Sequence, residues 1–162
     1  MNLRSLTLLA AVLLVAACAE DQTNKSDTTG TDTSAGRQTT TTAQPGSEID
    51  LQQNVGDRVF FDYDKSDIKP EGRQVLERQA DWLKKYANVT VTVEGHCDER
   101  GTREYNLALG ERRATAVKKM LVALGVAPNR VSTISYGKER PAVPGSTEAA
   151  WAQNRRGVTV VN

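Results

Sequence analysis

The chain has 162 residues, which is room for one ordinary domain and some additional segments. It carries 21 basic and 20 acidic side chains, so no net field draws the whole molecule to nucleic acid or to an anionic membrane surface. The composition therefore argues against a nucleic-acid-binding protein and predicts that any charged ligand is met at a local site.

The N-terminus has the layout of a bacterial export signal. Arg4 supplies a positive charge, and the apolar run at residues 6–17 is shorter than the about 20 residues that a membrane-spanning helix needs. Small residues stand directly before Cys18, which resembles the lipobox of bacterial lipoproteins. The resemblance implies removal of residues 1–17 and acylation of Cys18, and Ala19 implies sorting to the outer membrane. The alternative is an ordinary signal peptide with a chance cysteine.

A polar segment follows the expected anchor. Up to residue 54 it consists mainly of Thr, Ser, Asp, Gln and Gly, with almost no large apolar side chain. Such a composition buries too little apolar surface to offset the entropy of ordering. We therefore expect residues 18–54 to be a lipidated N-terminus with a disordered polar tether, and residues 55–162 to be the folded domain.

Within this domain the hydrophobic pattern predicts alternating strands and helices. Runs of β-branched and aromatic residues indicate strands at residues 58–63, 89–93, 131–136 and 158–161. Apolar residues at helical spacing indicate helices at residues 70–88, 107–124 and 146–153. The order predicts an α/β fold, an α+β sandwich with helices packed on a small mixed sheet.

The densest polar cluster, His-Cys-Asp-Glu-Arg-Gly-Thr at residues 96–102, lies between a predicted strand and a predicted helix, where α/β folds commonly build sites. A nucleophilic pair of Cys97 and His96 is disfavoured because adjacent residues leaving a strand point in opposite directions. A zinc site would be short of ligands, since the chain has one His. Glycine-rich phosphate loops and Gly-x-Ser-x-Gly elbows are missing from the sequence. We expect a binding module without metal or cofactor, not an enzyme.

Arg113 is predicted to lie at the border of the buried helix face, because Leu109 precedes it by one helical turn. Two interpretations stay open. Arg113 could form a structural ion pair with Asp98 or Glu111. Alternatively, Asp98 and Arg113 could line a cleft beside a helix N-terminus and hold the ammonium and the carboxylate of an amino-acid head group.

Four segments carry a family resemblance: VFFDYDKSDI, VEGHCDERGTREYNLALGERRA, ISYGKERPAVPG and EAAWAQNRRGVTV. In this order they resemble the C-terminal peptidoglycan-binding domain that outer-membrane protein A shares with the flagellar stator and with peptidoglycan-associated lipoproteins. The resemblance covers residues 59–161. With the lipobox and the polar tether, the chain is similar to the lipoprotein branch of this family, which acts in the Tol–Pal system.

The resemblance implies a ligand, the diaminopimelate side chain of the peptidoglycan stem peptide, bound non-covalently. It places Asp98 at the diaminopimelate ammonium and Arg113 at its carboxylate, with help from backbone amides of the 98–102 loop. The other positions around the ligand are Asp64, Arg100, Thr102 and Leu109. Cys97 stands where many relatives have Thr, and since a thiol is similar in size but bonds more weakly, we expect the packing to survive.

The resemblance also implies a cellular role. The acylated Cys18 would hold the protein in the outer membrane with its domain in the periplasm, so that it tethers membrane to wall in envelope integrity and cell division. TolB and other Tol proteins would be its protein partners. Two rivals remain, a domain of the same fold that recognises another ligand and a wall-cleaving enzyme.

Overall fold

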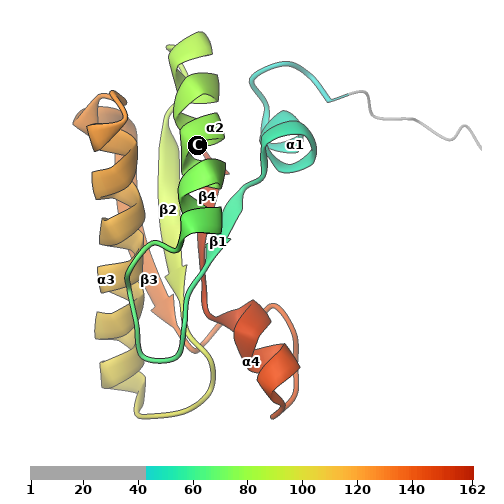
Figure 1. Ribbon diagram of the computed structural model, residues 1–162, viewed down its shortest axis with the longest axis vertical. Coiled ribbons are helices and arrows are strands. Elements are labelled where there is room, and N and C mark those ends of the chain that lie inside the picture. Colours follow the sequence, from blue (N-terminus) through green and yellow to red (C-terminus); the bar gives the residue numbers. More distant parts are fainter. Residues whose placement is uncertain (1–42) are drawn as a thin grey trace, which may run out of the picture. The chain divides into compact units, whose positions relative to one another are not determined.

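The computed structural model describes residues 43–162, so the expected signal peptide, the Cys18 anchor and the tether up to residue 42 lie outside it. Figure 1 shows the elements of this part. In chain order they are α1 (Glu48–Asp50), η1 (Leu51–Val55), β1 (Arg58–Phe60), α2 (Pro70–Lys85), β2 (Val91–His96), α3 (Arg103–Ala123), η2 (Pro128–Arg130), β3 (Val131–Gly137), α4 (Glu148–Asn154) and β4 (Arg156–Val161). None of the helices in this part is long and apolar enough to cross a membrane.

The four strands form one mixed sheet in the order β1-β4-β2-β3. The last strand, β4, lies between β1 and β2 and is antiparallel to both. β2 and β3 are parallel, with a register shift between Gly95 and His96. The expected α/β fold with helices on a small mixed sheet is confirmed, and the strand order brings the ends of β1 and β2 to the same end of the sheet (Figure 1).

One face of the sheet packs against the helices. Val91 and Val93 alternate with half-buried polar residues, so one side of β2 is fully buried and faces the core. Figure 1 shows α2 and α3 next to each other against the sheet. The apolar cluster between the layers includes Val59, Leu76, Leu83, Val91, Val93, Val117, Leu121 and Val131. This core fixes the direction in which α3 leaves the β2–α3 loop.

Two glycines let α3 approach β2 unusually closely. A Cβ atom on Gly95 would lie 1.8 Å from the carbonyl oxygen of Gly110, and one on Gly110 would lie 2.9 Å from the carbonyl oxygen of Gly95. Only glycine leaves room for such an approach of two backbones. The N-terminal half of α3 is thereby held directly beside the end of β2.

The folded part begins before residue 55, which corrects the expected tether boundary. Residues 48–55 form α1 and η1, and the side chain of Leu51 is fully buried in the core. Asp50 accepts a hydrogen bond of 2.8 Å from the indole N–H of Trp82 in α2. The boundary at 54 was wrong because these short helical turns bury their apolar residue against α2, which the polar composition of the segment does not reveal.

Candidate functional site

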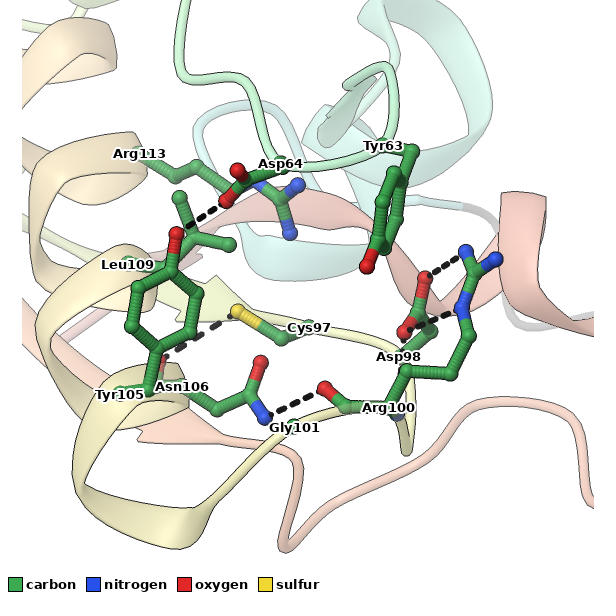
Figure 2. Close-up of a pocket in the computed structure, with 10 residues that line it drawn as sticks. All are labelled: Tyr63, Asp64, Cys97, Asp98, Arg100, Gly101, Tyr105, Asn106, Leu109 and Arg113. Carbon is green, nitrogen blue, oxygen red and sulfur yellow. Dashed lines mark hydrogen bonds and ion pairs between the residues drawn. The ribbon is translucent and has the colours of Figure 1, made fainter.

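A pocket of about 140 Å³ opens between the β1–α2 loop, the β2–α3 loop and the first half of α3. Figure 2 shows its side chains arranged as a ring. Its lining residues are Tyr63, Asp64, Cys97, Asp98, Arg100, Gly101, Tyr105, Asn106, Leu109 and Arg113. Five of the six ligand positions expected from the sequence therefore lie together, and two aspartates and two arginines give the ring balanced charge.

Asp98 is the most heavily bonded carboxylate of the pocket. It accepts from Arg100 through Nε at 3.1 Å, Nη2 at 2.6 Å and the backbone N–H at 3.1 Å. Arg155 Nη1 lies 3.4 Å from its Oδ2 atom. Burial of the carboxyl opposes its ionisation, but the bonds from Arg100 and Arg155 outweigh it, so the pKa of Asp98 lies below its usual value. Asp98 is therefore a buried anion.

Arg100 lies between two aromatic rings at the mouth of the pocket. Its guanidinium carbon is 4.1 Å from the centre of the Tyr63 ring and 4.0 Å from the centre of the Trp151 ring. Both separations are in the range of cation–π attraction. Tyr63 comes from the β1–α2 loop and Trp151 from α4, so the side chain joins two segments that lie far apart in the sequence.

Arg113 is fully buried, and the expected border position was wrong. It forms no ion pair with Asp98 or Glu111 within residues 43–162, which corrects that alternative. Its guanidinium donates instead to backbone carbonyls of the two loops, Lys65 O at 2.9 Å, His96 O at 2.8 Å and Asp62 O at 3.1 Å. Because the loops curl over the helix, a position at the edge of one face becomes interior.

Arg113 can still act toward the pocket. A guanidinium carries five N–H donors, and the three loop carbonyls use one each. Figure 2 shows the guanidinium directed from α3 toward the middle of the ring. Burial lowers the pKa of Arg113 from its very high usual value, but a guanidinium stays charged at neutral pH. The pocket therefore contains a fixed buried cation that still has N–H donors without a hydrogen-bond partner among the loop carbonyls.

A hydrogen bond connects Tyr105 and Asp64 across the pocket. Asp64 has φ of 56°, a left-handed conformation that short polar residues tolerate better than most. Its carboxylate accepts a hydrogen bond from the hydroxyl of Tyr105 in α3, and this bond raises the pKa of that hydroxyl. Both side chains are exposed, so Asp64 is the carboxylate of the pocket that solvent reaches most easily.

Thr102 is the one expected ligand position that does not line the pocket. Its hydroxyl accepts a hydrogen bond from Tyr105 N at 3.2 Å and so caps the N-terminus of α3. Substituting such a cap by Ala generally costs about 1 kcal/mol. Thr102 therefore acts on the pocket through the start of the helix that carries Tyr105, Asn106 and Leu109.

Cys97 keeps a hydrogen bond in the position where many relatives have Thr. Its thiol donates to the carbonyl oxygen of Asn106 at 3.4 Å. Burial raises the pKa of the Cys97 thiol to about 11, so the sulfur is protonated at neutral pH. The Asn106 side chain in turn donates to Arg100 O and Thr102 O, each at 2.9 Å, and fastens the loop to the helix.

Three further residues, which the sequence pattern did not indicate, form hydrogen bonds with the 98–102 loop. Lys138 Nζ donates to Glu99 O at 3.2 Å and Gly101 O at 2.6 Å. Trp151 Nε1 donates to Glu99 Oε1 at 3.0 Å. Arg155 is buried and also donates to Phe61 O at 3.0 Å. Tyr63, Tyr105 and Asn106 were missed as well, although each stands next to one of the polar clusters that the sequence shows.

Known proteins share both the sequence and the fold of this chain. Residues 60–155 match the sequence profile of the OmpA family. A peptidoglycan-associated lipoprotein of Rhizobium meliloti (strain 1021) is 50% identical over 153 residues, which are 94% of this chain and 84% of that protein. One from Pseudomonas aeruginosa is 56% identical over 97 residues, 60% of this chain and 57% of that protein.

Solved structures agree. The crystal structure of the peptidoglycan-associated lipoprotein from Burkholderia pseudomallei has a TM-score of 0.66 at 38% identity, covering 70% of this chain and 100% of that chain. The C-terminal domain of Helicobacter pylori MotB has a TM-score of 0.61 at 27% identity, covering 65% of this chain and 84% of that chain.

Proposed function

The chain belongs to the OmpA family and, within it, to the peptidoglycan-associated lipoproteins, and from this premise we propose that its folded domain binds peptidoglycan non-covalently through the pocket of Figure 2. The observation that carries the proposal is the charge arrangement of the pocket. Asp64, Asp98, Arg100 and Arg113 line one space of about 140 Å³. Paired opposite charges in so small a space suit a zwitterionic head group.

The zwitterion that we propose is the free end of diaminopimelate in the stem peptide. Arg113 is fully buried, and the N–H groups that it does not give to loop carbonyls would donate to the ligand carboxylate. Asp64 and Asp98 supply the acceptors for the ammonium. Leu109 also lines the pocket (Figure 2) and offers an apolar wall for the methylene chain.

We propose that the domain holds the wall without cleaving it. A thiol with a pKa of about 11 is a poor nucleophile at neutral pH, and Cys97 is in that state. His96 bonds Glu94 at 3.3 Å, and burial lowers its pKa to about 4. Within residues 43–162, groups of three or more His, Cys, Asp or Glu side chains that could bind a metal ion are absent. These features support recognition by fixed charges.

The test of this function is sedimentation of the protein with purified peptidoglycan, with soluble muropeptides measured in the supernatant. We expect the protein to pellet with the wall and to release no muropeptides. A protein that stays in solution would point to the same fold with another ligand. Release of muropeptides would point to a wall-cleaving enzyme.

We further propose that Cys18 is the acylated first residue of the mature protein, held in the outer membrane with its domain in the periplasm. Cys18 lies outside the described residues, and support comes from the lipobox pattern and from a relative named as a lipoprotein that matches 94% of the chain. Intact-mass analysis should show loss of residues 1–17 and added acyl mass. An unmodified terminus at Met1 or Ala19 would contradict this.

For the protein partners we propose TolB and other Tol proteins, with a role in envelope integrity and cell division. The support is the family membership together with the lipoprotein layout of the N-terminus. Co-purification of TolB with the chain from envelope extracts tests this part separately. Wall binding without any recovered Tol protein would leave the pocket proposal standing and refute the partnership.

A further inference from the structure

In this structure Asp98 has little capacity for an additional partner. A carboxylate offers about four lone-pair positions, and Asp98 accepts three hydrogen bonds from Arg100 and one from Arg155. The residue is 4% exposed. A ligand ammonium can therefore reach Asp98 only if one of these donors gives way.

The two arginines differ in how firmly they are held. Arg155 is buried and also donates to Phe61 O at 3.0 Å and to Glu148 Oε1 at 2.7 Å. Its movement would therefore break hydrogen bonds to three separate segments of the chain. The side chain of Arg100 is 29% exposed, and its side-chain hydrogen bonds within the described residues all go to Asp98. Arg100 is therefore the donor that can be displaced.

Displacement would not release Arg100 from the site. The rings of Tyr63 and Trp151 flank its guanidinium, and the Trp151 ring is itself fixed by the bond from its Nε1 atom to Glu99. Cation–π contact depends on the guanidinium face, so it persists when the N–H edge changes its partner. The aromatic pair thus keeps a positive charge at the pocket mouth whether or not Arg100 bonds Asp98.

Resting on the proposed function, we propose that Arg100 is a specificity-determining residue and that the ligand binds by exchanging ion-pair partners with it. The ligand ammonium replaces the guanidinium on Asp98, and the ligand carboxylate, which Arg113 holds from the buried side, becomes the new partner of Arg100 as well. Every charge stays paired in this exchange. A ligand with only an amine leaves Arg100 without an anion, and a ligand with only a carboxylate leaves the bond between Asp98 and Arg100 to compete with it, so both are disfavoured.

The test compares two probes that share a carbon chain. One is meso-diaminopimelic acid, and the other is cadaverine, which is the same chain without its two carboxylates. Calorimetric titration is done on the full chain, on Arg100→Gln and on Arg103→Gln. Arg103 is exposed and pairs with Glu139 at 3.5 Å, so its loss removes the same charge near the same helix end without touching Asp98.

The parent should prefer diaminopimelic acid to cadaverine. In Arg100→Gln the amine no longer competes with a guanidinium for Asp98, so cadaverine should bind severalfold more tightly than it binds the parent. Diaminopimelic acid should lose about tenfold or more, because its carboxylate has lost a charged partner. Arg103→Gln should match the parent for both probes.

A general structural role of Arg100 would weaken both probes alike and could not produce a gain for cadaverine. An Arg100→Gln variant without that gain therefore overturns the exchange, even when the parent binds diaminopimelic acid and wall. A parent that binds neither the acid nor purified wall refutes the proposed function itself.

A second measurement needs no substitution and covers the case of an unfolded variant. The side-chain Nε–H signal of Arg100 in the NMR spectrum of the parent should shift when diaminopimelic acid is added, because the bond to Asp98 at 3.1 Å is replaced. Loop backbone signals that move while the Arg100 side-chain signal stays in place would contradict the exchange.

Discussion

Gly95 in β2 and Gly110 in α3 meet backbone to backbone, so closely that a Cβ on Gly95 would lie 1.8 Å from the Gly110 carbonyl oxygen. The contact sets the distance between the strand and the helix. Cys97 and Asp98 follow Gly95 in the chain, and Leu109 and Arg113 flank Gly110 in the helix. The same approach that packs the core therefore brings the two sides of the pocket together.

A methyl group at position 95 would clash with α3, and side-chain movement cannot relieve the clash because its nearest neighbours are backbone atoms of the helix. We expect Gly95→Ala to lower the free energy of unfolding by about 1–3 kcal/mol, as measured by urea denaturation. Gly72→Ala is the matched control. Gly72 lies inside α2, and a Cβ on it would meet side chains of Ile68 and Val59 at the ordinary distance of 3.4 Å. Because Ala favours a helix more than Gly does, this change should be neutral or stabilising by up to about 1 kcal/mol. Equal stability of Gly95→Ala and the parent would refute the close contact.

Asp50 ties the first described turn to α2. Its carboxylate accepts bonds of 2.8 Å from Gly46 N, Asn54 Nδ2 and Trp82 Nε1. Asp50→Ala leaves the buried indole N–H without its partner, so the midpoint of thermal unfolding should fall. Asp81→Ala, which removes an exposed carboxylate of α2, should leave the midpoint unchanged. A drop of the same size in both variants would mean that the N-terminal turn adds no specific stability.

His96 predicts a pH dependence of stability. Burial, with the positive charges of Arg156, Arg140 and Arg58 and despite the nearby Glu94, lowers its pKa from 6.5 to about 4. Below pH 6.5 the unfolded chain binds a proton on this ring that the folded chain does not. The free energy of unfolding should therefore fall by at most about 1.4 kcal/mol per pH unit as the pH drops from 6.5 toward 4, where the effect levels off.

The carboxylates of the protein titrate in an overlapping range, so the His96 contribution is read as a difference. Urea unfolding of the parent and of His96→Gln is measured between pH 7 and pH 4. The parent should lose more stability than the variant over this range. Parallel curves would show that His96 keeps an ordinary pKa in the folded protein.

Cys97 should resist alkylation in the folded protein. Burial raises its pKa to about 11, so at pH 8 only about a thousandth of the thiol is ionised. The residue is also only 3% exposed, which blocks access of the reagent. Labelling by iodoacetamide should be slow in buffer and fast in urea. Labelling in buffer as fast as that of free glutathione would contradict the buried thiol.

Asp64 is suited to substitution because it is exposed and its carboxylate accepts its hydrogen bond from Tyr105, which is exposed as well. We expect Asp64→Asn to keep its melting temperature and to pellet less with purified wall, since the ligand ammonium loses an anionic partner. Asp67→Asn is the control, an exposed carboxylate of the same loop that does not line this pocket. Equal pelleting of the two variants would remove Asp64 from the ligand site.

Much of this protein is determined locally by its sequence. Apolar residues at period two or at helical spacing indicate which face of an element is buried. The four strands, the helices α2, α3 and α4 and the α/β class therefore followed from neighbours a few residues apart. The polar loop after the second strand pointed to Asp98, and helical spacing pointed to Arg113, whereas Asp64, Arg100 and Leu109 were expected only because the sequence resembles a known family.

Only the tertiary structure decided how these residues are partnered. Arg113 donates to carbonyls that lie 17, 48 and 51 residues away along the chain, and Asp98 meets Arg155 at a separation of 57. Leu51 is buried by a helix that starts 19 residues later. Periodicity describes one element at a time, whereas the partner of a buried charge or of a lone apolar side chain is set by which elements meet in space.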